Sequence, residues 1–221
     1  MAKYESHVTF STVAGIAYGL VGMLMLDIYP EHCILALAMI VIAGILPDID
    51  HKNGAVAKEV GTLISAVCPI LILKFLPGIK AGGMTRIALV VIACYLFTRV
   101  FIVRLLQNIT VERGMLHSIP AAIVIFEVVY LVFYDLYWTD RLYVATAAFA
   151  GFFFHLLLDA SSNVDIVGSA LGEGKKKTPA LKFFGNDTPA TVAVYLCMAT
   201  LGWFVMKDMY PNLSVQTAVT Y

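Results

Sequence analysis

Charged side chains are scarce in this sequence. Asp, Glu, Lys and Arg make up 14% of its 221 residues, whereas hydrophobic residues make up 60% and the mean hydropathy is +0.85. Soluble domains contain about 25% charged residues, so the composition predicts an integral membrane protein. The fifteen basic and fifteen acidic residues cancel, which argues against nucleic acid as a partner because no global basic field is present.

Cysteine is also sparse and has no metal-binding spacing. The four cysteines stand singly in apolar runs, at Cys33, Cys68, Cys94 and Cys197. Isolated cysteines in such runs usually serve as small buried hydrophobic residues. We therefore expect neither a disulfide framework nor a metal held by thiolates.

Long apolar runs are abundant, and about seven of them approach the length that crosses a hydrocarbon core of roughly 30 Å. They cover approximately residues 8–26, 33–46, 60–76, 87–106, 119–136, 142–158 and 190–206. The polar, glycine-rich stretch 161–189 is expected to be a loop before the last span. The sequence thus predicts an all-α, polytopic transmembrane helix bundle that forms one integral membrane domain over residues 1–221.

The distribution of basic residues gives the bundle an orientation. With seven spans, nine lysines and arginines fall on the side of the amino terminus and five on the other. Basic residues favour the cytoplasmic side, so the amino terminus is predicted to be cytoplasmic, although the basic loop around residues 74–86 argues the other way. Strict alternation then puts His7, residues 48–51, residues 113–117 and residues 155–159 at this one face. Only His32, among the five histidines, falls opposite.

The sequence Leu46-Pro47-Asp48-Ile49-Asp50-His51 is the most informative stretch at that face. Pro47 favours the end of a helix, because proline lacks a backbone donor and disfavours helical geometry in the residue before it. Asp48, Asp50 and His51 then lie just past the helix end. Two carboxylates and an imidazole can converge there on one metal ion.

His155 and Asp159 form the second motif. Residues four apart share a helix face, so both side chains can bind one ion, or they can simply hydrogen-bond to each other as a buried pair. The metal interpretation is favoured by Asp48, Asp50, His51 and His117, because ionisable groups in a membrane need partners. Histidine and aspartate without cysteine suit Zn²⁺, Mn²⁺ or Fe²⁺.

These ligands outnumber the four that one tetrahedral zinc uses. A pair of ions about 3.5 to 4 Å apart, bridged by Asp48 or Asp50, would use them and would suit hydrolysis of a phosphoester. Arg113, four residues before His117, can clamp a phosphate with two parallel hydrogen bonds, or it can be a cytoplasmic anchor. We favour the clamp.

The ordered motifs resemble a known family. His7, Pro47-Asp48-Ile49-Asp50-His51, Arg113-Gly114-Met115-Leu116-His117-Ser118 and the His155/Asp159 pair are similar to the motifs of the YdjM-like, membrane-bound, metal-dependent hydrolases of bacteria and archaea. That family usually has histidine where this chain has Glu112. The resemblance implies a relationship to the zinc-dependent phospholipase C and single-strand nuclease superfamily, two or three zinc ions, and a cell-membrane location. The implied metal ligands are His7, Asp48, Asp50, His51, His117, His155 and Asp159.

We therefore expect a hydrolase that cleaves a phosphoester, with a membrane lipid as the substrate and Zn²⁺, or Mn²⁺, as cofactor. Asp48, Asp50 and Arg113 are the expected catalytic residues: an aspartate not fully engaged by metal handles the proton, and the arginine binds phosphate. A metal-free lipid phosphatase would need a lysine-arginine motif and a serine-glycine-histidine motif, and neither is present. An ion or metal transporter and a metal-stabilised scaffold are the alternatives from other classes.

Overall fold

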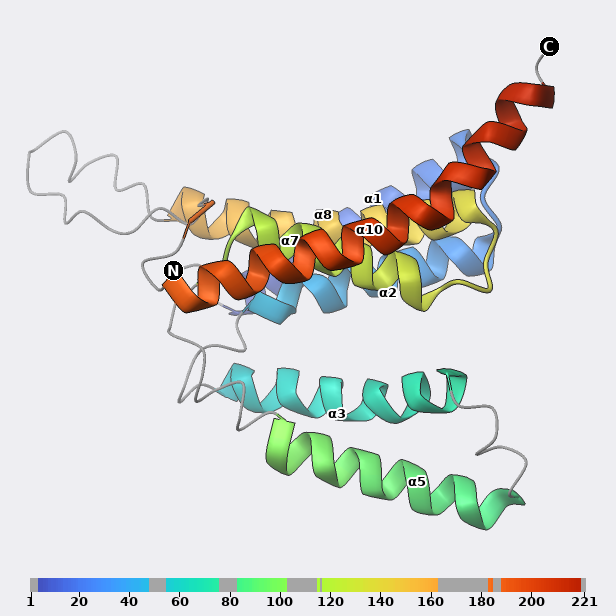
Figure 1. Cartoon of the computed structure of the whole chain (residues 1–221). Helices are drawn as coiled ribbons and strands as arrows, with labels where there is room; N and C mark the ends of the chain where they lie inside the picture. The colour runs from blue at the N-terminus through green and yellow to red at the C-terminus, as the bar shows by residue number, and fades with distance from the viewer. Residues whose placement is uncertain are drawn as a thin grey trace, which may run out of the picture. The chain divides into compact units, whose positions relative to one another are not determined.

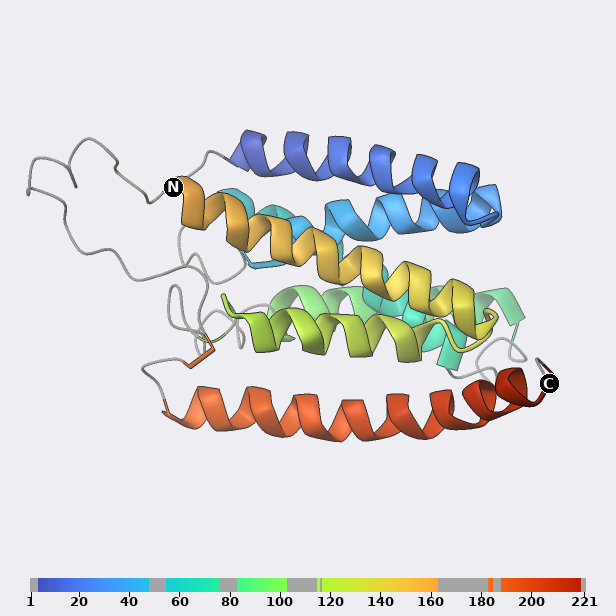
Figure 2. The same cartoon turned by 90° about the horizontal axis from the view of Figure 1, so that it is seen from above.

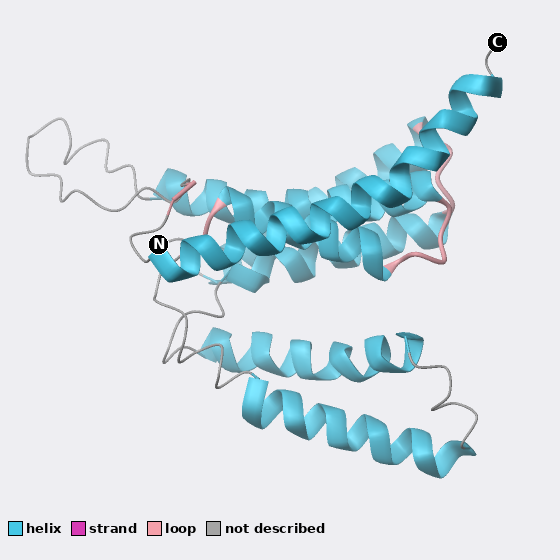
Figure 3. Cartoon of the chain, viewed as in Figure 1, coloured by secondary structure: helices cyan, strands magenta, loops and turns pink. Residues whose placement is uncertain are grey.

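The chain is built from α-helices throughout the part that the structure, a computed structural model, describes (Figures 1 and 3). Described are residues 4–47, 55–75, 83–102, 115, 117–162, 183–184 and 188–219, and they include no strand. The helices are α1 (Tyr4–Met25), α2 (Pro30–Ile45), α3 (Ala55–Phe75), α5 (Gly83–Phe97), α7 (Ile119–Val132), α8 (Trp138–Ser162) and α10 (Thr188–Val219), with a π-helical segment η2 (Thr98–Ile102) after α5. The predicted all-α class is confirmed. Six predicted spans each overlap one α-helix, and the span predicted at 87–106 overlaps α5 and the π-helical segment η2.

Four stretches of the described chain are both long enough and apolar enough to cross a membrane. They are His7–Met25, Gly83–Val100, Trp138–Ser161 and Thr188–Tyr210. Shorter apolar helices cover Pro30–Ile45, Ile64–Lys74 and Ile119–Val132. Lengths of 18 residues and more match the thickness of a hydrocarbon core, so the helices are those of a multi-pass membrane protein.

The helices belong to two compact units. The first contains residues 1–47 and 113–221, and the second contains residues 48–112. In the second unit, α3 packs against both α5 and η2. The first unit contains α1, α2, α7, α8 and α10, and it holds all of the candidate site residues that the structure describes.

Helix α8 is the centre of the first unit. It packs against α2, α7 and α1, while α10 packs against α7 (Figure 2). The shared core is rich in small residues, which let helix backbones approach closely where apolar lipid offers no hydrophobic drive for association. Ala36 and Ala43 of α2 and three alanines of α8 are buried, at positions 145, 147 and 148.

Two glycines allow close helix contacts, Gly151 between α8 and α2 and Gly44 between α2 and α1. A Cβ atom on Gly151 of α8 would collide with the backbone of Ile40 on α2, and a Cβ atom on Gly44 would collide with the Ser11 side chain of α1. Only a residue without a side chain allows this approach. Further along the helices, Tyr18 of α1 and Tyr143 of α8 each donate a hydroxyl hydrogen bond of 2.9 Å to the other's carbonyl oxygen.

Helix α10 is longer than the predicted last span, which ended near residue 206. Its extension is stabilised by Asp208, which accepts hydrogen bonds from Arg141 Nη1 at 2.8 Å and from the Tyr130 hydroxyl at 3.0 Å. Arg141 also donates from Nε to the Tyr130 carbonyl at 3.2 Å. A prediction from hydropathy ends the span at the first charged residues, Lys207 and Asp208. Asp208 is paired with Arg141, and the observed helix continues past it.

Candidate metal centre

The candidate site lies where four helix ends of the first unit meet. His7 belongs to the first turn of α1, Gly44 to the last turn of α2, and His155 and Asp159 to the last two turns of α8. His117 lies two residues before the start of α7. Ser118 caps that helix, since its hydroxyl accepts from the Ala121 amide at 3.3 Å and donates to the Met115 carbonyl at 2.5 Å. The cap fixes the backbone beside His117.

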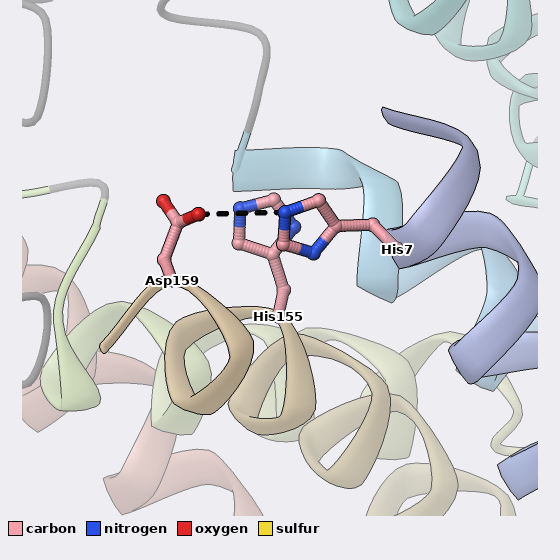
Figure 4. Close-up of side chains that lie close together, drawn as sticks. All are labelled: His7, His155 and Asp159. Atoms are coloured by element: carbon pink, nitrogen blue, oxygen red, sulfur yellow. Dashed lines mark ion pairs between the residues drawn. The ribbon is translucent and has the colours of Figure 1, made fainter. Parts of the chain in front are cut away.

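Three side chains converge at the centre of this site. One ligand atom each from His7, His155 and Asp159 lies within 4.8 Å of the other two. His7 Nε2 is 3.4 Å from Asp159 Oδ1, and the rings of His7 and His155 stack with centroids 4.1 Å apart (Figure 4). The residues are 2%, 1% and 2% exposed. Such burial of ionisable groups is costly unless they bind one another or an ion.

A backbone carbonyl determines which nitrogen of His155 faces the cluster. Nδ1 lies 2.7 Å from the carbonyl oxygen of Gly44. A carbonyl can only accept a hydrogen bond, so Nδ1 carries the proton and Nε2 keeps its lone pair. Metal-binding histidines are usually oriented in this way by a partner on the other ring nitrogen.

His117 lies beside the three converging residues. Its ring centroid is 5.5 Å from that of His155, with the planes 66° apart, and the residue is 4% exposed. His117 is not part of the group formed by His7, His155 and Asp159, whose ligand atoms all lie within 4.8 Å of one another. A third imidazole therefore flanks the site on the α7 side.

The residues fit a divalent transition metal. Two imidazoles and one carboxylate are the donor types that Zn²⁺ takes in three-ligand sites with an open position. The contact between His7 and Asp159 is longer than a good hydrogen bond. Moreover, His7 Nδ1 and Ser11 Oγ are buried with no hydrogen-bond partner among the described residues, and buried polar atoms without such a partner call for an explanation, for example a bound ion.

The structure brings together four of the seven predicted metal ligands, namely His7, His117, His155 and Asp159. The remaining predicted site residues, Asp48, Asp50, His51 and Arg113, lie outside the described residues. His32 lies at the other end of α2, 3.4 Å from Asp140 in the first turn of α8. It is thus remote from the cluster, as its predicted position on the opposite face requires.

Two functional positions were missed by the sequence predictions. Gly44 contributes only its backbone carbonyl oxygen. Every residue has this group, so the sequence alone does not mark Gly44 as a hydrogen-bond acceptor for His155. Gly151 allows the close approach of α2 and α8, and a signal for it existed: Ala147 and Gly151 have the spacing of four residues that is typical of small residues at membrane helix contacts.

Comparison with known proteins agrees with the resemblance drawn from the motifs. No curated protein and no solved structure matches the chain. The family model described as YdjM inner membrane protein matches residues 1–168, which include the described candidate ligands from His7 to Asp159 and the apolar helices α1 to α8. The relationship to metal-dependent hydrolases stays a prediction. By this match, which covers most of its length, the chain is a multi-pass membrane protein that belongs to the YdjM inner membrane protein family.

Proposed function

We propose that this protein is a membrane-bound, metal-dependent hydrolase that cleaves a phosphoester of a lipid. The observation that carries the proposal is the convergence of His7, His155 and Asp159, three buried metal-ligand side chains, at one end of the helix bundle. Buried clusters of this kind in membrane proteins are functional-site candidates by default, because their burial has a high energetic cost.

His7, His155 and Asp159 would hold a divalent ion, with His117 next to it, and Zn²⁺ or Mn²⁺ suits these donors. Such an ion polarises a phosphoryl oxygen and activates water for attack. In the proposal, Asp48, Asp50 and His51 supply ligands for a second or third ion. These three residues precede α3 and lie outside the described part of the chain.

The protein's own groups have separate roles in this scheme. Gly44 holds His155 through the 2.7 Å hydrogen bond, so that the imidazole does not rotate away. An aspartate that is not fully engaged by metal, Asp48 or Asp50, takes up the proton of the attacking water. Arg113 binds the phosphate with two parallel hydrogen bonds and orients it.

The depth of the site supports a lipid substrate. His7 and Asp159 are each three residues from an end of their helix, a distance of about 5 Å along the axis at 1.5 Å per residue. Ligands at this depth lie close to the headgroup layer, where phosphoesters of lipids are found. Transporter sites typically lie near the middle of the bilayer, so the position favours the hydrolase over the ion or metal transporter.

The deciding experiment is mass spectrometry of membrane lipids incubated with purified protein and Zn²⁺ or Mn²⁺. We expect wild type to convert a phospholipid or an isoprenoid-type phosphoester, and Asp159→Asn to lose both bound metal and conversion. Glu31→Gln, on the exposed first turn of α2, is a control that should behave as wild type. Metal binding without any lipid conversion, combined with metal flux into vesicles that Asp159→Asn abolishes, would establish the transporter instead.

Arg113 tests the phosphate contact separately from the metal. Arg113→Lys keeps the positive charge but loses the planar fork of donors, so most of the activity should be lost while metal content stays at the wild-type value. Full activity of Arg113→Lys would show that Arg113 does not bind the phosphate through two parallel hydrogen bonds, and would favour its role as a membrane anchor.

A further inference from the structure

A second buried ionisable group lies away from the metal centre. Glu127 is in α7, eight residues after its start at Ile119, which is about 12 Å along the helix axis. Its chain neighbours Ile125, Phe126 and Val128 are apolar, and Glu127 itself is only 6% exposed. Glutamate is rare at such depth, and when present it usually has a function.

The carboxyl group of Glu127 occupies a space that a glycine of α10 leaves open. A Cβ atom on Gly202 would lie 2.9 Å from Glu127 Oε1, so a side chain at position 202 would displace the carboxyl group. Val205, one turn along α10, is buried. The other oxygen, Oε2, is buried with no hydrogen-bond partner among the described residues.

The charged groups on the helices that pack against α7 are paired with other residues, belong to the candidate metal centre, or are exposed. Arg141 of α8 and Asp208 of α10 bind each other, and Asp140 of α8 faces His32. His155 and Asp159 belong to the metal centre, and His117 precedes α7 beside that centre. Lys207 of α10 is exposed. Among the described residues, no ion pair with Glu127 offsets its charge.

We propose that Glu127 is a proton-binding site inside the membrane, at the contact between α7 and α10. An ionised carboxylate there would have little contact with solvent, since Glu127 is 6% exposed, and no cation beside it among the described residues. The cost of that state is far greater than the cost of holding a proton. The neutral acid packs against Gly202 and keeps α10 in place. Loss of the proton places a bare charge in this contact and weakens it. The proposal is independent of the metal centre and of lipid hydrolysis.

A proton-bound carboxyl group within lipid has a chemical signature. Hydrophobic carbodiimides enter membranes and react with protonated carboxyl groups: the acid proton moves to a carbodiimide nitrogen, and the carboxyl oxygen bonds to the central carbon. Ionised carboxylates in water are poor partners for the same reagent. Glu127 should therefore react with dicyclohexylcarbodiimide, whereas exposed carboxyl groups such as Glu31 should not.

The experiment treats the purified full-length protein in phospholipid vesicles with dicyclohexylcarbodiimide at about pH 6 and at about pH 9. Peptide mass spectrometry then locates the label. We expect a single label on Glu127 that is several-fold weaker at the higher pH, and no label on Glu127→Gln. Absence of label on wild-type Glu127 at both pH values, or equal labelling at both, overturns the proposal.

Thermal unfolding provides a second readout. Glu127→Gln mimics the neutral acid, so it should keep wild-type stability at the lower pH and lose less stability than wild type as the pH rises. Gly202→Ala displaces the carboxyl group and should weaken the labelling. If Glu127→Gln does not fold, the label position and its pH dependence in wild type still decide the question. A Gln variant whose stability falls with pH as steeply as that of wild type contradicts the role in holding α10.

Discussion

Gly151→Ala should loosen the candidate metal centre from a distance, without altering any of its proposed ligands. A Cβ atom at Gly151 would lie 2.7 Å from Ile40 Cα and closer still to the Ile40 carbonyl oxygen, whereas ordinary contact begins near 3.4 Å. The obstacle is backbone, so α2 and α8 must move apart by about 1 Å, because packed helices have no spare volume. Gly151 and Ile40 each lie one turn before the residues that make the hydrogen bond, His155 and Gly44.

The same separation lengthens the His155 Nδ1 to Gly44 oxygen distance from 2.7 Å to roughly 3.7 Å, which is too long for a hydrogen bond. Overpacking costs about 1–3 kcal/mol and the lost hydrogen bond about 0.5–1.5 kcal/mol. Alanine is more favourable than glycine inside a helix by about 1 kcal/mol, which offsets part of this loss. The net loss of unfolding free energy is thus about 0.5–3.5 kcal/mol. Metal affinity should fall about 10- to 100-fold, as when other outer partners of ligating histidines are lost.

Competition with a chromophoric chelator measures the metal affinity, and thermal unfolding in detergent measures stability. Gly19→Ala is the matched control, because its new Cβ would meet nothing closer than the Cys33 carbonyl at 3.4 Å. It should keep metal affinity and gain up to about 1 kcal/mol from helix propensity. If Gly151→Ala binds metal as tightly as wild type, the hydrogen bond to Gly44 does not hold His155 in place.

Further predictions concern the cap, the α10 contact and the metal. Ser118→Ala should lower stability by about 1 kcal/mol through loss of the α7 cap and should also weaken metal binding through His117; an unchanged affinity would separate His117 from the site. Asp208→Asn should lower the unfolding temperature, since Arg141 loses its charged partner, at a cost of about 1–3 kcal/mol; an unchanged temperature would show that α10 is held by apolar contacts alone. A chelator should lower the unfolding temperature of wild type but not of Asp159→Asn, because binding to the folded state stabilises it; equal responses would place the metal elsewhere.

The helices were predictable from the sequence because membrane helices are marked by long apolar runs. Each run gave an α-helix, with η2 continuing α5 in the run at 87–106, and Pro47 lies just past the end of α2 as expected. The predicted ends were less accurate where polar residues are directed into the bundle or paired with another side chain. Helix α1 begins before the predicted run because His7 is directed into the bundle, and α10 continues past residue 206 because Asp208 is paired.

The grouping of His7, His117, His155 and Asp159 followed from counting spans, since alternation puts the ends of these helices on one face. The details of the site did not follow. The orientation of His155 depends on the Gly44 carbonyl. A backbone carbonyl is common to all residues, so the sequence does not show which one His155 contacts. The buried position of Glu127 depends on Gly202, which is a neighbour in space but distant in the chain. Only packing brings such pairs together.

The site is assembled from both ends of the first unit's sequence, and this affects how the protein is made. Gly44 and His155 are 111 positions apart, and the whole second unit is synthesised between them. Helices α1 and α2 are therefore synthesised before α8. His7 and the Gly44 carbonyl are in place before their contact residues, His155 and Asp159, have been made. In the proposed function, His155 and Asp159 join His7 only after α8 has been inserted, so the ion would be captured late in biogenesis and a chain that ends before α8 would lack the site.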